Sequence, residues 1–332
     1  MKAIGYHSEG SADVLVDLNV AKPMAGARDL LVAVKAVSVN PVDYKVRSFE
    51  APSAGAAKIL GWDVAGVVVD VGADVRMFRR GDEVFYAGAM DRPGANSEFH
   101  LVDERIVGPK PRTLSFEEAA ALPLTSITAW EILFDRMRVE RAKEGTLLVI
   151  AAAGGVGSIL VQLARQLTRL TIVGTASRQE SADYARKMGA HHVIDHRRPF
   201  IESMREIGLP GADYVAALTT TPESLPWIID VLRPQGHVNF IDNPEIGVMP
   251  FKPKSLTISW EMMFTRSLFQ TEDIIEQHRL LKEVASLVDT GRIVTTLTRI
   301  DGPLTAANLA AAHRHLESGR SIGKTVLSAI PH

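Results

Sequence analysis

The stretch EGTLLVIAAAGGVGSILVQLAR, residues 144–165, decides the fold of this chain of 332 residues. Residues 147–152 form a short apolar run, which is typical of a buried parallel strand. The glycine-rich turn AAGGVG, residues 152–157, follows at once. Apolar residues then recur at helical spacing over residues 159–167. The stretch therefore predicts a strand, a tight turn and a helix in immediate succession.

A strand, turn and helix of this kind are typical of a Rossmann unit, which binds a dinucleotide, and here Ala152 stands in the place of the first glycine. Gly154 lets the backbone approach a pyrophosphate, whereas Gly157 lets the helix pack close to the strand. The unpaired N–H groups at the start of the helix, around Gly155 and Val156, then face the phosphates. A plain glycine-rich turn is the alternative interpretation.

The end of the next strand indicates which dinucleotide is bound. Residues 170–176 form this strand, and Ser177-Arg178-Gln179 follows it, with Ser177 twenty residues beyond Gly157. An acidic residue here would accept hydrogen bonds from a ribose 2′-hydroxyl and repel a 2′-phosphate. The hydroxyl of Ser177 and the guanidinium of Arg178 instead suit the phosphate of NADP. We therefore predict NADPH as the cofactor; a merely solvated Arg178 is the alternative, and it would leave NAD in use.

Composition narrows the class of protein. The chain has 37 basic and 39 acidic residues and no basic block, so nucleic acid is not an expected partner. No stretch reaches the length of a membrane span and the start lacks a secretory segment, which predicts a cytoplasmic protein. Cysteine is absent, which excludes disulfides, thiolate catalysis and cysteine-ligated zinc.

Two kinds of pattern divide the chain. About the first hundred residues are strand-like and punctuated by glycine, as in a compact β-domain. From Thr146 strands and helices alternate, which predicts a parallel sheet with right-handed crossovers, a fifth strand at residues 238–241 and a sixth near residues 257–259. The tail returns to strand character, which indicates a return to the first domain. The predicted fold class is α/β, with a Rossmann-type doubly wound parallel sheet and a β-domain.

Five blocks together resemble one known family. They are residues 144–165, NPVDYK at 40–45, GWDVAG at 61–66, PLT at 123–125 with TAW at 128–130, and GKTVL at 323–327. The whole chain is similar to the zinc-independent quinone oxidoreductase and zeta-crystallin branch of the medium-chain dehydrogenase/reductase superfamily, and to a subgroup named zinc-type alcohol dehydrogenase-like. The resemblance implies a chaperonin-10 (GroES)-like catalytic domain at residues 1–122, completed by residues 266–332, and a Rossmann NADP(H)-binding domain at residues 123–265. It further implies NADPH in the cleft between the domains, and a homodimer formed through the edge of the Rossmann sheet.

The chain departs from the zinc alcohol dehydrogenases. Those enzymes hold catalytic zinc with a cysteine and a histidine, whereas here the first position falls near Asp43 and Trp62 replaces the histidine. Asp63 follows, but alone it cannot supply three protein ligands with an open site. The cysteines of the structural zinc lobe are missing too. We therefore predict no metal, and hydride delivery to an acceptor that is already electrophilic, namely a quinone or another activated enone.

The resemblance places the catalytic groups in the segment around residues 40–45. We expect Tyr44 to donate a hydrogen bond to the developing oxyanion and Asn40 to act as a positioning group. We expect Trp62 to wall the substrate pocket, with Asp43 and Asp63 holding the loop there by hydrogen bonds rather than acting as general bases. Ordinary packing is the alternative for Tyr44 and for Trp62.

Further cofactor contacts follow from the resemblance alone. They are Thr128, the residues Phe240 and Ile241 at the end of the fifth strand, and Lys324 in the final GKT block. Packing or capping is the alternative for these residues. Two other functions stay open: a non-catalytic NADPH-binding protein with a structural or regulatory role, and a 2-enoyl thioester reductase, for which a basic site for coenzyme A does not stand out.

Overall fold

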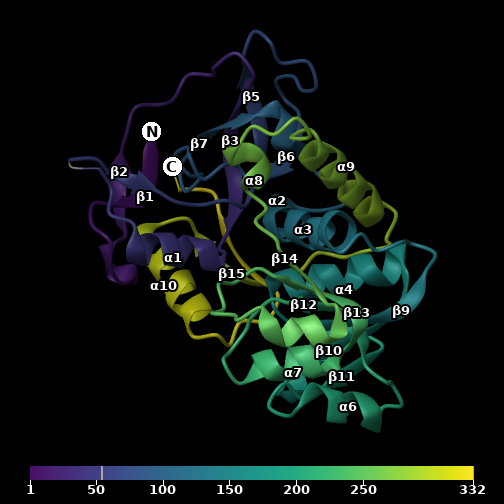
Figure 1. Ribbon diagram of the computed structural model, residues 1–332. Helices are drawn as coiled ribbons and strands as arrows, with labels where there is room; N and C mark the ends of the chain where they lie inside the picture. Colours follow the sequence, from purple (N-terminus) through teal and green to yellow (C-terminus); the bar gives the residue numbers. More distant parts are fainter. Residues whose placement is uncertain (54, 332) are drawn as a thin grey trace. The chain divides into compact units, whose positions relative to one another are not determined.

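The computed structural model describes residues 1–53 and 55–331, and the chain divides into two compact units (Figure 1). The first unit consists of Met1–Ile127 and Phe264–His332, and the second consists of Thr128–Met263. Helix α3 (Pro123–Trp130) carries the chain from the first unit into the second. The amino-terminal and carboxyl-terminal segments therefore belong to the same unit.

Two sheets form the body of the first unit. Its strands are β1 (Lys2–Tyr6), β2 (Val16–Asn19), β3 (Asp29–Ser38), β4 (Lys58–Ile59), β5 (Val64–Val71), β6 (Glu83–Tyr86), β7 (Phe99–Asp103), β8 (Val107–Pro109), β15 (Leu297–Pro303) and β16 (Lys324–Ser328). The larger sheet has the order β15-β16-β3-β5-β6-β8, with β7 also paired to β3, and the smaller has the order β2-β1-β4. Most residues of β3 are buried because this strand pairs with β5, β7 and β16. Its β-branched sequence suits such a central place.

Local signals place the helices of the first unit. Helix α2 (Phe116–Ala120) begins at a capping box, in which Ser115 Oγ accepts from the Glu118 backbone N–H at 3.1 Å and the Glu118 carboxylate accepts from the Ser115 N–H at 2.9 Å. Helix α9 (Glu276–Asp289) ends just before Gly291, whose φ of +70° suits glycine. Helix α1 (Pro41–Phe49) lies beside α10 (Ala306–Glu317) (Figure 1). The short helices are η1 (Ala12–Val14), η2 (Glu104–Ile106) and α8 (Thr265–Leu268).

A six-stranded parallel sheet forms the second unit and confirms the predicted doubly wound fold. Its strands are β9 (Glu144–Ile150), β10 (Arg169–Thr175), β11 (His192–Ile194), β12 (Ala212–Ala217), β13 (Leu232–Phe240) and β14 (Thr257–Trp260). Their order is β11-β10-β9-β12-β13-β14, so the chain starts in the middle and winds outward in both directions. All the pairs are parallel, and the carboxyl ends of the strands therefore lie at one edge of the sheet.

Helices connect these strands, as the crossovers of a parallel sheet require. They are α4 (Gly155–Leu167), α5 (Gln179–Lys187), α6 (Phe200–Glu206) and α7 (Ser224–Val231), with the π-helical stretch η3 (Glu131–Arg136) before β9 and η4 (Met249–Lys254) before β14. A cluster of buried apolar side chains joins the sheet to α6 and α7, and it includes Leu148, Phe200 and Val231. The apolar run of β9 is almost wholly buried, as expected of a strand covered on both faces.

Two strand limits differ from the sequence-based expectation. Strand β9 ends at Ile150, before Ala152, because Ala151 has a φ of +60° and turns the chain. Strand β13 begins at Leu232, well before the expected start at residue 238 and directly after α7. The pairing of β13 with β12 shifts register at this end, and such an irregularity leaves no alternation for the sequence to reveal.

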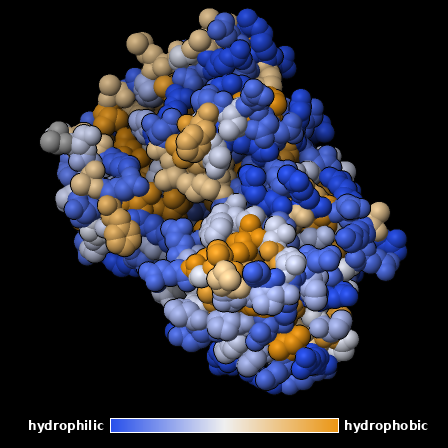
Figure 2. Space-filling model, viewed as in Figure 1, coloured by the Kyte–Doolittle hydropathy of each residue, from blue (hydrophilic) through white to orange (hydrophobic). Residues whose placement is uncertain are grey.

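Several large apolar side chains of the described chain are exposed. Within residues 1–53 and 55–331, no helix is both long and apolar enough to cross a membrane. The face in view in Figure 2 is largely hydrophilic, with separate apolar areas. Trp260 and Met262, at the end of the edge strand β14, are 46% and 47% exposed. A homodimer formed through this edge stays a prediction.

Candidate active site

The glycine-rich turn leaves the sheet at the carboxyl end of β9. Ala151 has the left-handed conformation, one residue before Ala152, where the first glycine was expected. The Ala151 N–H donates to the Thr175 hydroxyl at 3.0 Å, and its carbonyl oxygen accepts from the Gly154 N–H at 3.0 Å. Ala152 is buried, and a Cβ added to Gly174 of β10 would lie 2.7 Å from the Ala152 Cβ. A small side chain is therefore required at Ala152 for packing.

The two outer glycines of the turn have different surroundings. A Cβ on Gly157 would lie 2.4 Å from the Ala151 carbonyl oxygen, so only glycine lets α4 pack this close to the end of β9. A Cβ on Gly154 would meet only that same oxygen, at 3.3 Å, and space is open around it. Gly154 is the N-cap of α4, and Gly155, Val156 and Gly157 carry N–H groups that a helix start leaves without intrahelical partners. This arrangement fits the phosphates of a dinucleotide.

Ser177 and Arg178, the residues predicted to distinguish NADP from NAD, lie at the same carboxyl edge of the sheet as the glycine-rich turn. Strand β10 pairs with β9 in parallel and ends at Thr175, so Ser177 and Arg178 follow the strand end next to the turn. Both side chains are half-buried, and Arg178 is the N-cap residue of α5. The structure thus brings the turn and the predicted phosphate-binding residues to neighbouring strand ends.

The other predicted cofactor residues of the second unit have mixed surroundings. Phe240 ends β13 with its side chain fully buried, and Ile241 follows it at the carboxyl edge of the sheet. The next residue, Asp242, accepts a hydrogen bond from the Thr220 hydroxyl at 3.2 Å, which ties the ends of β12 and β13 together. Thr128 is a buried residue of α3. Contacts of these residues with a cofactor stay predictions.

A buried polar cluster in the first unit centres on Asp63, which is fully buried. Asp63 Oδ2 accepts from the Ser38 hydroxyl at 2.7 Å and the Asn40 amide nitrogen at 3.1 Å, and it pairs with the Lys324 ammonium at 3.0 Å. Asp63 Oδ1 accepts from the Leu124 backbone N–H at 3.0 Å. Residues 38–40, Leu124 and Lys324 therefore meet at the Asp63 carboxylate, and these contacts hold the loop that carries Asp63.

Helix α1 carries two further predicted residues. Asp43 is buried and accepts from the Asn40 backbone N–H at 2.6 Å, so it caps the start of the helix. Burial raises the pKa of Asp43 to about 7. Tyr44 is half-buried, and burial together with the negative charge of Glu317 raises the pKa of its phenol. A phenol is protonated at neutral pH even without this shift, so Tyr44 can donate a hydrogen bond.

Trp62 is 1% exposed, and its indole N–H donates to the Ala89 carbonyl oxygen at 3.2 Å. The ring of Phe264 packs edge-on against it, with centroids 6.0 Å apart. A role as the wall of a substrate pocket stays a prediction.

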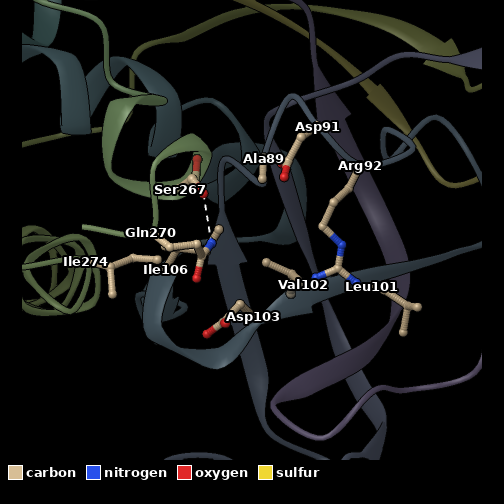
Figure 3. Close-up of a pocket in the computed structure, with 10 residues that line it drawn as sticks. All are labelled: Ala89, Asp91, Arg92, Leu101, Val102, Asp103, Ile106, Ser267, Gln270 and Ile274. Carbon is tan, nitrogen blue, oxygen red and sulfur yellow. Dashed lines mark hydrogen bonds between the residues drawn. The ribbon is translucent and has the colours of Figure 1, made fainter. Parts of the chain in front are cut away.

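Ala89 also lines a small pocket of the first unit, which Figure 3 shows. Its polar side chains are paired: Arg92 forms two hydrogen bonds with Asp29, and Gln270 donates to the Ser267 carbonyl oxygen at 2.8 Å. The volume of about 50 Å³ is far below the roughly 300 Å³ at which ligand sites begin. This pocket is too small for a quinone.

Comparison with known proteins assigns the chain to a family. The alcohol dehydrogenase GroES-like domain family matches residues 26–112, and the zinc-binding dehydrogenase family matches residues 188–327. The zinc-type alcohol dehydrogenase-like protein SAS2087 of Staphylococcus aureus (strain MSSA476) is 38% identical over 313 residues, which cover 92% of each chain. The chain belongs to the medium-chain dehydrogenase/reductase superfamily.

Two further relatives of this medium-chain dehydrogenase/reductase bear on its chemistry. The crystal structure of Escherichia coli quinone oxidoreductase complexed with NADPH matches with a TM-score of 0.85 at 27% identity and covers 100% of both chains. The 2-methylene-furan-3-one reductase of Solanum lycopersicum is 31% identical over 340 residues, which cover 100% of this chain and 80% of the relative. The predicted fold class and family resemblance are confirmed.

Several relatives of this medium-chain dehydrogenase/reductase carry zinc in their names, but the donors here do not fit a zinc ion. Catalytic zinc takes three protein ligands and keeps one open position. Asp63 Oδ2 already has three partners, and one of them is the Lys324 ammonium, which would repel a second cation. Within residues 1–53 and 55–331, no group of three or more His, Cys, Asp and Glu side chains could hold a metal.

Two members of the Asp63 cluster in this medium-chain dehydrogenase/reductase were not predicted from the sequence. Ser38 is the last residue of β3, and no local pattern distinguishes it. Leu124 follows Pro123, the first residue of α3, and a proline at a helix start marks a place where backbone N–H groups lack partners. That signal could have predicted an acidic partner for the helix start, although not which one.

Proposed function

We propose that this protein is an NADPH-dependent oxidoreductase that transfers a hydride to quinones or other activated enones without zinc. The observation that carries the proposal is the Asp63 cluster, where an ammonium and hydrogen-bond donors bind the carboxylate, and the described residues contain no group of three or more His, Cys, Asp and Glu side chains that could hold a metal. The names of two relatives, a quinone oxidoreductase complexed with NADPH and a 2-methylene-furan-3-one reductase, support it.

The second unit supplies the cofactor site in this proposal. Residues 154–157 offer N–H groups to the pyrophosphate, and Ser177 and Arg178 bind the 2′-phosphate at the neighbouring strand end. A guanidinium pairs more strongly with a phosphate than with a ribose hydroxyl, which favours NADPH over NADH. When bound, NADPH supplies the hydride.

The first unit supplies the groups that act on the acceptor. Addition of a hydride to a conjugated system moves an electron pair onto the carbonyl oxygen, and a fixed donor at that oxygen lowers the barrier. Tyr44 is the proposed donor, because it lies on α1 about one turn after Asn40 and a phenol is protonated at neutral pH. One proton from solvent then completes the two-electron reduction of the quinone or enone.

The experiment that tests the proposal follows NADPH oxidation by the purified protein with 9,10-phenanthrenequinone and with a panel of enones. Parallel reactions contain NADH in place of NADPH, or protein pretreated with a metal chelator. We expect turnover that prefers NADPH and is unchanged by the chelator.

Each arm of this experiment can contradict a part of the proposal. Loss of turnover after chelation would show that a metal takes part. Preference for NADH would contradict the role of Arg178. Tight binding of NADPH without turnover of any acceptor would refute the enzyme and favour the non-catalytic protein, in which NADPH raises only the unfolding temperature.

A further inference from the structure

We propose that Lys324 is a positioning residue, which holds the Asn40 side-chain amide in the one orientation that directs an N–H of Asn40 to the oxygen of the acceptor. The inference rests on the function proposed above. It gives Lys324 a role at the acceptor in place of the expected contact with the cofactor. It also makes Asn40 a second hydrogen-bond donor, in addition to Tyr44.

The Lys324 ammonium is bound by groups of its own unit. Its residue is 3% exposed, and three acceptors surround its nitrogen: the Val39 carbonyl oxygen at 2.8 Å, Asp63 Oδ2 at 3.0 Å and Asn40 Oδ1. An ammonium has three protons and no lone pair; two of its protons are donated to Val39 and Asn40, and its charge is paired with Asp63. A contact with a cofactor phosphate would have to compete with this buried ion pair.

The neighbours of the Asn40 amide allow only one orientation. Lys324 can only donate, so the amide oxygen must face it, and the Asp63 carboxylate can only accept, so the amide nitrogen must face that. Exchanging the two atoms would place donor against donor and acceptor against acceptor. The nitrogen has a second hydrogen, which Asp63 does not take. Asn40 can therefore offer a ligand an N–H, and its oxygen stays bound to Lys324.

This N–H belongs to the same helix start as Tyr44. Asn40 is the N-cap of α1, fixed by the hydrogen bond from its backbone N–H to Asp43, and Tyr44 follows about one turn later. A helical turn rises by about 5.4 Å, which is a suitable spacing for two donors at one conjugated acceptor. Ser38 donates to the same Asp63 oxygen as Asn40, and the Leu124 N–H donates to the other oxygen, so both oxygens of the carboxylate that binds Asn40 are held by hydrogen bonds.

The test compares Lys324→Met, Asn40→Ala and the double variant with the wild type. Lys110→Met is the matched control, because Lys110 is also buried in the first unit, with its ammonium bound to two carbonyl oxygens and to Glu83 at 3.2 Å. Turnover of 9,10-phenanthrenequinone gives kcat and KM, fluorescence titration gives the Kd of NADPH, and thermal unfolding reports the fold.

We expect Lys324→Met and Asn40→Ala each to lower kcat by about tenfold or more. The double variant should fall no further, because Lys324 acts through Asn40. The Kd of NADPH should stay within about twofold of the wild type in all of them. Lys110→Met should keep the wild-type kcat even where it lowers the unfolding temperature.

Four results would overturn the inference. They are a roughly tenfold rise in the NADPH Kd of Lys324→Met, a wild-type kcat in that variant, a further fall of kcat in the double variant, and an equal fall of kcat in Lys110→Met. Should Lys324→Met not fold because Asp63 is left unpaired, Lys324→Met/Asp63→Asn removes both charges. A wild-type kcat there would refute positioning, and a kcat below that of Asp63→Asn alone would support it. A wild type without turnover refutes the proposed function itself.

Discussion

Two alanine substitutions in the glycine-rich turn are predicted to have different effects: Gly157→Ala should lower stability, and Gly154→Ala should weaken NADPH binding. In Gly157→Ala the added Cβ would lie 2.4 Å from the Ala151 carbonyl oxygen and 2.7 Å from the Ala152 Cα. Both neighbours are backbone atoms, which cannot swing aside as a flexible side chain can. In Gly154→Ala the nearest atom lies at 3.3 Å, and the Gly154 conformation, with φ −75° and ψ 178°, suits any residue.

These distances set the expected magnitudes. An ordinary Cβ contact begins at 3.4 Å, so Gly157→Ala forces α4 and the turn apart by about 1 Å. Such overpacking costs about 1–3 kcal/mol, which lowers the unfolding temperature of a domain of this size by roughly 3–9 °C. Gly154→Ala leaves the fold as stable as before or slightly more stable. Its methyl group instead keeps the pyrophosphate from the helix start, and losing one such hydrogen bond, about 1.5–3 kcal/mol, weakens NADPH binding roughly tenfold to hundredfold.

Two measurements separate these effects. Thermal unfolding without cofactor should show a loss for Gly157→Ala alone, and fluorescence titration with NADPH should show weaker binding for Gly154→Ala. Wild-type affinity in Gly154→Ala would mean that the pyrophosphate does not lie at this turn. A wild-type unfolding temperature in Gly157→Ala would mean that α4 has room to move.

Three further predictions concern other parts of the chain. Arg178→Ala should raise the KM for NADPH about tenfold and change that for NADH little; equal losses in steady-state kinetics would contradict a contact with the 2′-phosphate. Trp260→Glu places a charge on the exposed edge strand β14 and should convert the predicted dimer to a monomer, and an unchanged mass by light scattering would place the interface elsewhere. Burial lowers the pKa of His100 from 6.5 to about 4, so the unfolded chain takes up the proton first as the pH falls. The contribution of His100 to stability should therefore be complete above pH 6.5 and smaller by about 2 kcal/mol at pH 5. Urea unfolding should show a loss that is smaller by this amount in His100→Gln than in the wild type, and an equal loss would exclude a contribution of His100.

Local patterns in the amino-acid sequence predict most of the second unit. The apolar run of β9, the turn and the amphipathic α4 are contiguous, so each is visible as a local pattern. The limits of strands β9 and β13 differ from the expected ones because the backbone is irregular there. Ala151 has a left-handed conformation that alanine rarely adopts, and β13 begins at a shift of register. Neither feature can be recognised from composition or periodicity.

The hydrogen-bond partners of the residues in the candidate acceptor site depend on how the chain folds and cannot be predicted from local patterns. The sequence singled out Asn40, Asp63 and Lys324 but did not predict that they bind one another, and the structure brings the three side chains together. Asn40 and Lys324 are 284 positions apart, and a hydrogen bond across such a separation leaves no periodic trace in the chain. A buried charge without partners would be strongly destabilising, so it must be paired. Which residues become its partners depends on which segments the sheets bring together.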